Sequence, residues 1–134
     1  MAENLSKETK ELFVKFQQGE LDGVLVYQTL YELTDDAELK AAFSEAASDE
    51  GRHAGILKNI TGEVLKPNPE AAAKIKAALG ALGMAALLER ISATEYAGFD
   101  LYKPYLEYPG VAAMQQDEKK HGDMMAAQAK RIKG

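Results

Sequence analysis

Both histidines of this chain stand three residues after a glutamate, within the same local motif. The two stretches are DEGRH, residues 49–53, and DEKKH, residues 117–121. A spacing of three places both side chains on one face of a helix. Glutamate and histidine in this arrangement are used to hold metal ions inside helical bundles. One such pair alone is commonly an exposed helical pair, but its occurrence at both histidines favours a metal site.

The residues around these motifs favour helix almost throughout the chain. Long runs are rich in Ala, Leu, Glu and Lys, and no segment alternates like a strand. The pattern predicts long helices at about residues 6–33, 36–60, 84–105 and 111–131, and a short helix at about 70–79. Short turns at LTDD and EYPG predict two antiparallel hairpins, joined by residues 61–80. The prediction is an all-α four-helix bundle with one long crossover that contains a short helix.

Residues with known preferences at helix ends set these boundaries. We expect Ser6 as an N-cap, and Asn68 with Pro69 as the N-cap and first position of the short helix. We expect helix ends or bends at four further residues: Gly62, Gly80, Gly83 and Pro104.

Each long helix has an apolar heptad seam with one glutamate in its middle. Four buried carboxylates that face one another require a counter-charge, because a lone buried carboxylate costs several kcal/mol or takes up a proton. Two divalent cations would balance four carboxylates, and two neutral imidazoles would complete the ligand set. The sequence therefore predicts a carboxylate-bridged two-metal site whose candidate ligands are Glu20, Glu50, His53, Glu95, Glu118 and His121.

The positions of these glutamates along the helices agree with one common layer. Glu20 and Glu50 are equally far from residue 35, inside the first predicted turn, and Glu95 and Glu118 are equally far from the second turn. The spacing also repeats: a glycine follows at three residues and a tyrosine at seven, after Glu20 and again after Glu95. The chain therefore reads as two copies of one hairpin.

The residues that accompany the glutamates have more than one interpretation. Tyr27 and Tyr102 fit equally well as core aromatics or as donors of a hydrogen bond to a metal-binding carboxylate. We expect Asp49 and Asp117 to be solvated helix acids; the alternative is that each orients a metal-binding histidine of the neighbouring helix.

Glycines and methionines along the seams also have two interpretations. Gly23 and Gly98 cost about 1 kcal/mol each inside a helix relative to Ala. They either permit close helix packing or leave space for dioxygen or peroxide, and we favour the second because both face the site. We expect the remaining tyrosines to be structural, and four methionines to fill gaps in the core: Met84, Met114, Met124 and Met125.

Composition excludes several classes of function. The 134 residues fit one domain, residues 1–134. The chain has no cysteine, which excludes disulfides, thiolate metal sites and a rubredoxin-type iron site. A net charge of −5 disfavours a nucleic-acid partner. No apolar segment is typical of a signal peptide or a membrane span, so we expect a cytoplasmic protein without a membrane partner.

The pattern of Glu and Tyr seven apart, followed by Glu and His three apart, and then both again, resembles the ferritin-like superfamily and most closely the rubrerythrins. The stretch DEGRHAGILKNITG, residues 49–62, is similar to the second helix of rubrerythrin-like domains. The resemblance extends from about Leu12 to Ala127. It implies a ferritin-like bundle and a pair of iron ions, although manganese or zinc suits the same ligands.

The resemblance also implies individual roles. Glu20 and Glu95 would each bind one iron, Glu50 and Glu118 would bridge, and His53 and His121 would bind one iron each. Tyr27 and Tyr102 would support the carboxylates.

Two departures from rubrerythrins accompany these roles. Gly98 stands where rubrerythrins carry a further glutamate, which puts full rubrerythrin-type peroxidase activity in question. The residues of a rubredoxin domain are not among these 134, so we expect electrons to come from a separate protein.

The expected function is that of an oxidoreductase that reduces peroxide or oxidises ferrous iron with dioxygen, in defence against oxidative stress. The expected partners are peroxide or dioxygen and a separate electron-donor protein, and the resemblance implies a homodimer. The alternative is an iron-binding storage or sensing protein without turnover. A monooxygenase acting on an organic substrate and a metal-free bundle are further alternatives.

Overall fold

The part of the chain that the structure describes contains five α-helices and one 3-10 helix, joined by short connections. The computed structural model describes residues 5–134. The α-helices are α1 (Lys7–Leu33), α2 (Ala37–Thr61), α3 (Glu70–Leu82), α4 (Met84–Tyr102) and α5 (Val111–Lys133), and the 3-10 helix η1 (Lys103–Tyr105) follows α4. No strand occurs within these residues. The predicted all-α ferritin-like bundle is therefore confirmed.

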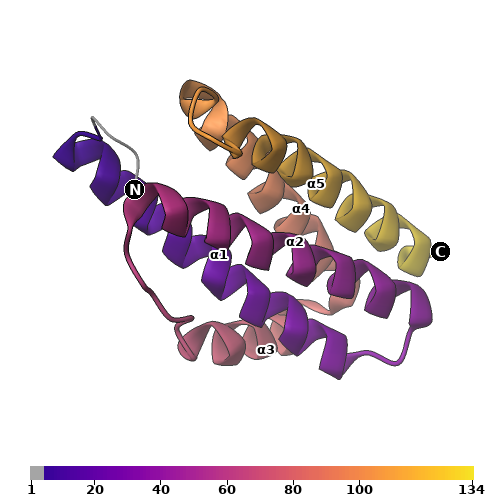
Figure 1. The fold of residues 1–134 in the computed structure, drawn as a ribbon. Coiled ribbons are helices and arrows are strands. Elements are labelled where there is room, and N and C mark those ends of the chain that lie inside the picture. The colour runs from indigo at the N-terminus through magenta and orange to yellow at the C-terminus, as the bar shows by residue number, and fades with distance from the viewer. Residues whose placement is uncertain (1–4) are drawn as a thin grey trace.

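The four long helices form two antiparallel hairpins, α1 with α2 and α4 with α5, and α3 lies in the crossover between them (Figure 1). The hairpins meet mainly where α2 packs against α5, while α3 packs against α1 and α4. Within residues 5–134, α1 and α4 make no direct backbone contact with each other. The backbones of α1 and α4 therefore lie farther apart than those of α2 and α5, and side chains such as Phe16 and Tyr102 make contact between them.

The helix ends follow from local side-chain chemistry. The Ser6 hydroxyl accepts a hydrogen bond from the backbone N–H of Thr9, and Asp36 caps α2 through the N–H of Leu39. Gly62 ends α2 at a φ of 75°, in the left-handed region that glycine adopts without strain. The Asn68 carboxamide accepts from the N–H of Glu70, and Pro69 already has helical dihedral angles.

Two predicted helix boundaries need correction. Gly80 lies inside α3 and does not break it, since a glycine in a right-handed helix costs only about 1 kcal/mol. Gly83 alone separates α3 from α4, because its φ of 79° is incompatible with either helix. The α-helical part of α4 ends at Tyr102, three residues before the predicted end, because Pro104 lies in η1, where the helix tightens.

Two apolar clusters fill the bundle, one on each side of the layer that contains the glutamates. One cluster includes Leu30, Phe43, Leu88 and Met125. The other includes Phe13, Leu57, Ile60, Val111 and Met114. Met114 and Met125 are fully buried, and Met84 and Met124 pack against the first cluster, as predicted for core methionines. The polar layer is thus enclosed at both ends by tightly packed apolar side chains.

No helix among the described residues is both long and apolar enough to cross a membrane.

Candidate metal centre

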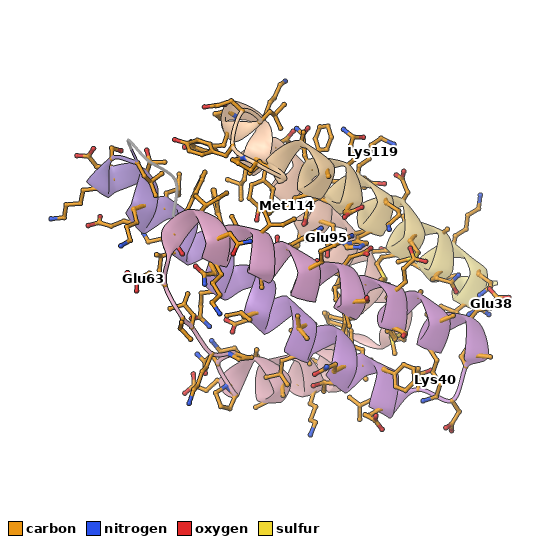
Figure 2. All side chains as sticks on the ribbon, in the orientation of Figure 1. Glu38, Lys40, Glu63, Glu95, Met114 and Lys119 are labelled. Carbon is orange, nitrogen blue, oxygen red and sulfur yellow. The ribbon has the colours of Figure 1, made fainter. Side chains whose placement is uncertain are left out.

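The structure brings the six predicted ligand residues together in the middle of the bundle. Glu20 comes from α1, Glu95 from α4, and the Glu–His pairs from α2 and α5. Their ligand atoms form two groups, in each of which all four atoms lie within 4.8 Å of one another. Figure 2 shows Glu95 in the interior of the bundle, whereas Lys119 of α5 projects from its surface. The two groups are Glu20, Glu50, His53 and Glu118, and Glu50, Glu95, Glu118 and His121.

Glu50 and Glu118 belong to both groups, as bridging ligands would. The other members belong to one group each. The predicted division into bridging and terminal carboxylates therefore agrees with the geometry, and the metal-binding role of each residue stays a prediction.

Both histidines direct Nδ1 toward the carboxylates. The Nδ1 atom of His53 lies 3.4 Å from Glu20 Oε2 and 3.3 Å from Glu118 Oε1. The Nδ1 atom of His121 lies 3.4 Å from Glu50 Oε1 and 3.6 Å from Glu95 Oε2. Both imidazoles are fully buried, and their ring centroids are 6.2 Å apart. The two Nδ1 atoms are thus the only ring nitrogens that face the carboxylate cluster.

Three buried polar atoms of the cluster have no hydrogen-bond partner among the described residues: Glu95 Oε2, Glu118 Oε1 and His121 Nδ1. Buried polar atoms are almost always paired, so each exception requires an explanation. All three are ligand atoms of the predicted type, and they face the shared centre. Carboxylate oxygens and imidazole nitrogens suit divalent iron, manganese or zinc, and the residues present therefore fit a pair of metal ions.

Each buried tyrosine donates a hydrogen bond to a glutamate of the other hairpin. Tyr102 donates to Glu20 Oε1 at 2.8 Å, and Tyr27 donates to Glu95 Oε1. Burial and the neighbouring carboxylates raise the pKa of both phenols well above the ordinary value, so both hydroxyls keep their protons. Of the two interpretations from sequence, the structure supports the one in which the tyrosines support carboxylates. The sequence did not predict that each tyrosine donates to a glutamate of the opposite hairpin.

Asp49 and Asp117 hold the outer nitrogens of the two histidines. Asp117 Oδ2 lies 2.8 Å from His53 Nε2, and Asp49 Oδ2 lies 2.8 Å from His121 Nε2. The prediction that both aspartates are merely solvated is wrong, because each lies against the imidazole of the opposite hairpin. A carboxylate at Nε2 fixes the ring orientation and leaves Nδ1 free for a metal.

Two cations bridge these aspartates on the α2–α5 face. Arg52 donates to Asp49 Oδ1 at 2.9 Å and to Asp117 Oδ2 at 2.8 Å. Lys120 lies 2.7 Å from Asp49 Oδ2 and 3.7 Å from Asp117 Oδ1. Although burial opposes ionisation, Lys120 and His121 lower the pKa of Asp49. The sequence analysis missed Arg52 and Lys120; their positions one residue before each histidine were the available signal.

The neighbouring carboxylates raise the pKa values of both histidines, which favours the protonated imidazoles. Burial lowers the pKa of His53, but Glu118, Glu20 and Asp117 outweigh it and raise that pKa to about 10. Burial likewise opposes a charged His121, yet Glu95, Asp49 and Glu118 raise its pKa to about 9. Burial and the nearby Glu95 and Glu20 carboxylates raise the pKa of Glu118 to about 9. The ligand set therefore attracts positive charge strongly.

The two seam glycines lie directly against the shared glutamates. A Cβ at Gly98 would lie 2.8 Å from Glu118 Oε2, and a Cβ at Gly23 would lie 3.3 Å from Glu50 Oε2. Both glycines face the site, as predicted, and Gly98 leaves no room for any side chain unless Glu118 moves.

The rubrerythrin family model matches residues 11–129. The chain belongs to the rubrerythrin family.

Curated relatives match a shorter part of this rubrerythrin-family chain. Over 62 residues it is 44% identical to a magnesium-protoporphyrin IX monomethyl ester [oxidative] cyclase of Prochlorococcus marinus (strain MIT 9301), and 44% identical to that of strain MIT 9312. Each match covers 42% of this chain and 16% of the relative. The chain thus matches about a sixth of the length of these relatives. No solved structure matches it significantly.

A pocket of about 470 Å³ connects the centre of this rubrerythrin-family chain with the outside between α1 and α4. All four site glutamates line it, together with Gly23 and Gly98. On the opposite side the histidines, the aspartates and the two bridging cations close the centre. Small molecules therefore have an approach to the four glutamates along the α1–α4 side.

Proposed function

We propose that this chain binds two iron ions and uses them to reduce peroxide or to react with dioxygen. One observation carries the proposal: two groups of four buried ligand atoms share Glu50 and Glu118. Membership of the rubrerythrin family supports it. When bound, the iron pair would supply two electrons to the oxidant, one from each ion.

The protein's own residues set the conditions for this chemistry. Glu20 and Glu95 would each hold one ion, Glu50 and Glu118 would hold both, and the histidines would bind through Nδ1. The Tyr27 and Tyr102 hydroxyls hold Glu95 and Glu20 in position and keep their protons. The glycines at positions 23 and 98 line the same pocket and let α1 and α4 approach Glu50 and Glu118 closely, which a side chain at either position would hinder.

Repeated turnover would require an electron donor that re-reduces the iron after each reaction. The chain has no cysteine and hence no thiolate-bound iron of its own. We therefore propose a separate electron-donor protein. A homodimer and a cytoplasmic location belong to the same proposal.

Two other functions use the same site. The chain could store or sense iron without turnover, which repeated reduction by a suitable donor distinguishes: renewed oxidation in each cycle indicates an enzyme. The similarity to cyclases that are named oxidative supports oxidation of an organic molecule as a second candidate. A product that contains oxygen from the oxidant would identify that activity.

The first experiment counts metal per chain. We expect about two iron ions after anaerobic loading and desalting, and close to none in a variant with both Glu50→Ala and Glu118→Ala. A matched control is Glu45→Ala, because Glu45 is exposed on α2 and its one ion pair within residues 5–134 is with Lys120, at 3.3 Å. Wild-type protein that retains no metal would refute the proposed centre.

The second experiment measures the reaction with the oxidant. The diferrous protein is mixed with peroxide or with dioxygen in a stopped-flow instrument. Oxidation faster than that of free ferrous ion is expected, and an equal rate would reject the redox proposal while leaving the metal count intact.

A further inference from the structure

The pocket between α1 and α4 is larger and more apolar than peroxide or dioxygen requires. Its volume of about 470 Å³ is within the range of about 300–1,000 Å³ that is typical of sites for organic ligands. Its walls include Phe16 and Val26 from α1 and Ile91, Ala97 and Leu101 from α4. Leu101 is 56% exposed, although it is a large apolar side chain. The pocket thus exposes apolar surface to water, and an apolar ligand would bury that surface.

The shape of the pocket is elongated because two antiparallel helices border it. The lining residues of α1 extend from Lys15 to Tyr27. This stretch of helix is about 18 Å long at a rise of 1.5 Å per residue. Gly19 and Gly23 lie along it without side chains, and Ala97 and Gly98 lie on the α4 wall. A slender, extended molecule would fit better than a compact one.

The charges of the pocket are unevenly distributed. Its floor carries the four site glutamates, which two divalent cations would neutralise. At one end of the rim, Lys15 is exposed and takes no part in the ion pairs formed within residues 5–134. Asp22, two turns further along α1, is occupied by hydrogen bonds from the side chain of Gln18 and the backbone N–H of Asn68. An anionic group would therefore be attracted to Lys15.

We propose that the α1–α4 pocket binds a straight-chain carboxylate of medium length. Its alkyl chain lies along the apolar walls beside the metal pair, and its carboxylate contacts Lys15. The inference concerns binding alone and requires no oxidation. It rests on the proposed function only in that two bound cations make the floor of the pocket neutral.

The test uses zinc-loaded protein, whose metal content is counted in every sample. Decanoate is titrated in a calorimeter below the concentration at which it forms micelles. We expect one molecule to bind per chain, and affinity to rise about fourfold for each CH₂ from hexanoate to decanoate, because each buried CH₂ adds apolar contact. Protein that holds two zinc ions but shows no saturable binding would overturn the inference without affecting the metal centre.

Two glycines offer a matched pair of variants. A Cβ at Gly19 or at Gly55 would meet no atom within 4 Å, but only Gly19 lines the pocket. Gly19→Phe should therefore weaken decanoate binding at least tenfold, and Gly55→Phe should leave it unchanged. Ala97→Phe blocks the pocket from the α4 wall and serves as an independent variant. Unchanged affinity in both blocking variants, with two zinc ions retained, would refute the proposed location.

The position of the carboxylate is tested at Lys15. Lys15→Gln should weaken decanoate binding at least fivefold and leave the binding of 1-decanol unchanged. An equal effect on both ligands, or no effect on either, would reject the contact with Lys15. The alternative occupant of the pocket is a second copy of the chain, and the mass of the protein in solution tests it. A stable dimer that Gly19→Phe dissociates would assign the pocket to that second copy and overturn the proposal.

Discussion

Asp117 of α5 lies 2.8 Å from Nε2 of His53, which belongs to α2 in the other hairpin. Asp49 of α2 has the same relation to His121 of α5. Each hairpin thus supplies the carboxylate that orients the histidine of the other. The two imidazoles are fixed by residues far away in the chain, and both present Nδ1 to the carboxylate cluster.

Removal of Asp117 should weaken metal binding. In Asp117→Ala the outer nitrogen of His53 loses its partner, and the loss of such a contact typically costs about 10–100-fold in metal affinity. Competition with a chelator of known affinity measures the change. Asp123→Ala is the control, because Asp123 is also on α5 but pairs with Lys119 and Tyr96 away from the centre. An Asp117 variant with wild-type affinity would contradict the proposed role.

Removal of the Tyr102 hydroxyl should destabilise the fold. Tyr102→Phe leaves the buried Glu20 Oε1 without its 2.8 Å donor, so we expect the free energy of unfolding to fall by about 1–3 kcal/mol. Chemical denaturation of the metal-loaded protein measures it. Tyr105→Phe should change stability little, since Tyr105 is only partly buried and its hydroxyl donates no side-chain hydrogen bond within the described chain. Equal losses in the two variants would show that the contact with Glu20 has no special role.

The glycines should differ in their sensitivity to an added methyl group. Gly98→Ala places Cβ 2.8 Å from Glu118 Oε2, so a shared carboxylate must move, and we expect weaker metal binding and slower oxidation. Gly23→Ala, at 3.3 Å from Glu50 Oε2, should have a smaller effect. Gly19→Ala meets no atom within 4 Å and should stabilise α1 by up to about 1 kcal/mol. Metal affinity should therefore be lowest in Gly98→Ala, intermediate in Gly23→Ala and unchanged in Gly19→Ala. If Gly98→Ala binds metal as tightly as Gly19→Ala, a steric conflict with Glu118 does not explain why position 98 is glycine.

The stability of the metal-free protein should fall as the pH rises. The pKa values of His53 and His121 are raised to about 10 and about 9, above the ordinary value of about 6.5. Groups whose pKa is raised by folding stabilise the protein below the unfolded pKa, and this contribution is lost as the pH rises through the folded pKa. Glu118, raised to about 9, has the same sign. Melting temperatures of the metal-free protein should therefore fall between about pH 6.5 and pH 10.

Metal binding should release protons for the same reason. The pKa values of His53, His121 and Glu118 are raised in the metal-free protein, so loading two divalent cations should release protons at pH 7. A weakly buffered titration with an indicator dye counts them. Metal affinity should consequently fall as the pH falls. A constant affinity from pH 8 to pH 5, or melting temperatures of the metal-free protein that rise with pH, would refute this charge balance.

The heptad seams and the turns were sufficient to predict the helices and the layer of six candidate ligands. The seam identifies the residues that face inward, and the equal distances of the glutamates from each turn identify those at one height. Neither signal states which helix lies next to which around the bundle. The sequence offered both kinds of contact as alternatives, but the partners, such as Glu20 for Tyr102 and His53 for Asp117, depend on that order and could not be assigned. The pocket was also invisible, because it results from a gap between α1 and α4 that no local pattern encodes.

Because the candidate ligands are divided between the two hairpins, a bound metal pair would act as a cross-link between them. Metal coordinated by Glu20, Glu50, Glu95 and Glu118 would connect four points spread over most of the chain. Such a cross-link closes long loops in the unfolded ensemble, and the entropy of closing them grows with loop length. Although the chain has no cysteine, metal binding would thereby stabilise the fold as disulfides do, and a chelator would reverse the effect. Loss of metal would then weaken the packing of α2 against α5, which joins the two hairpins, before either hairpin unfolds.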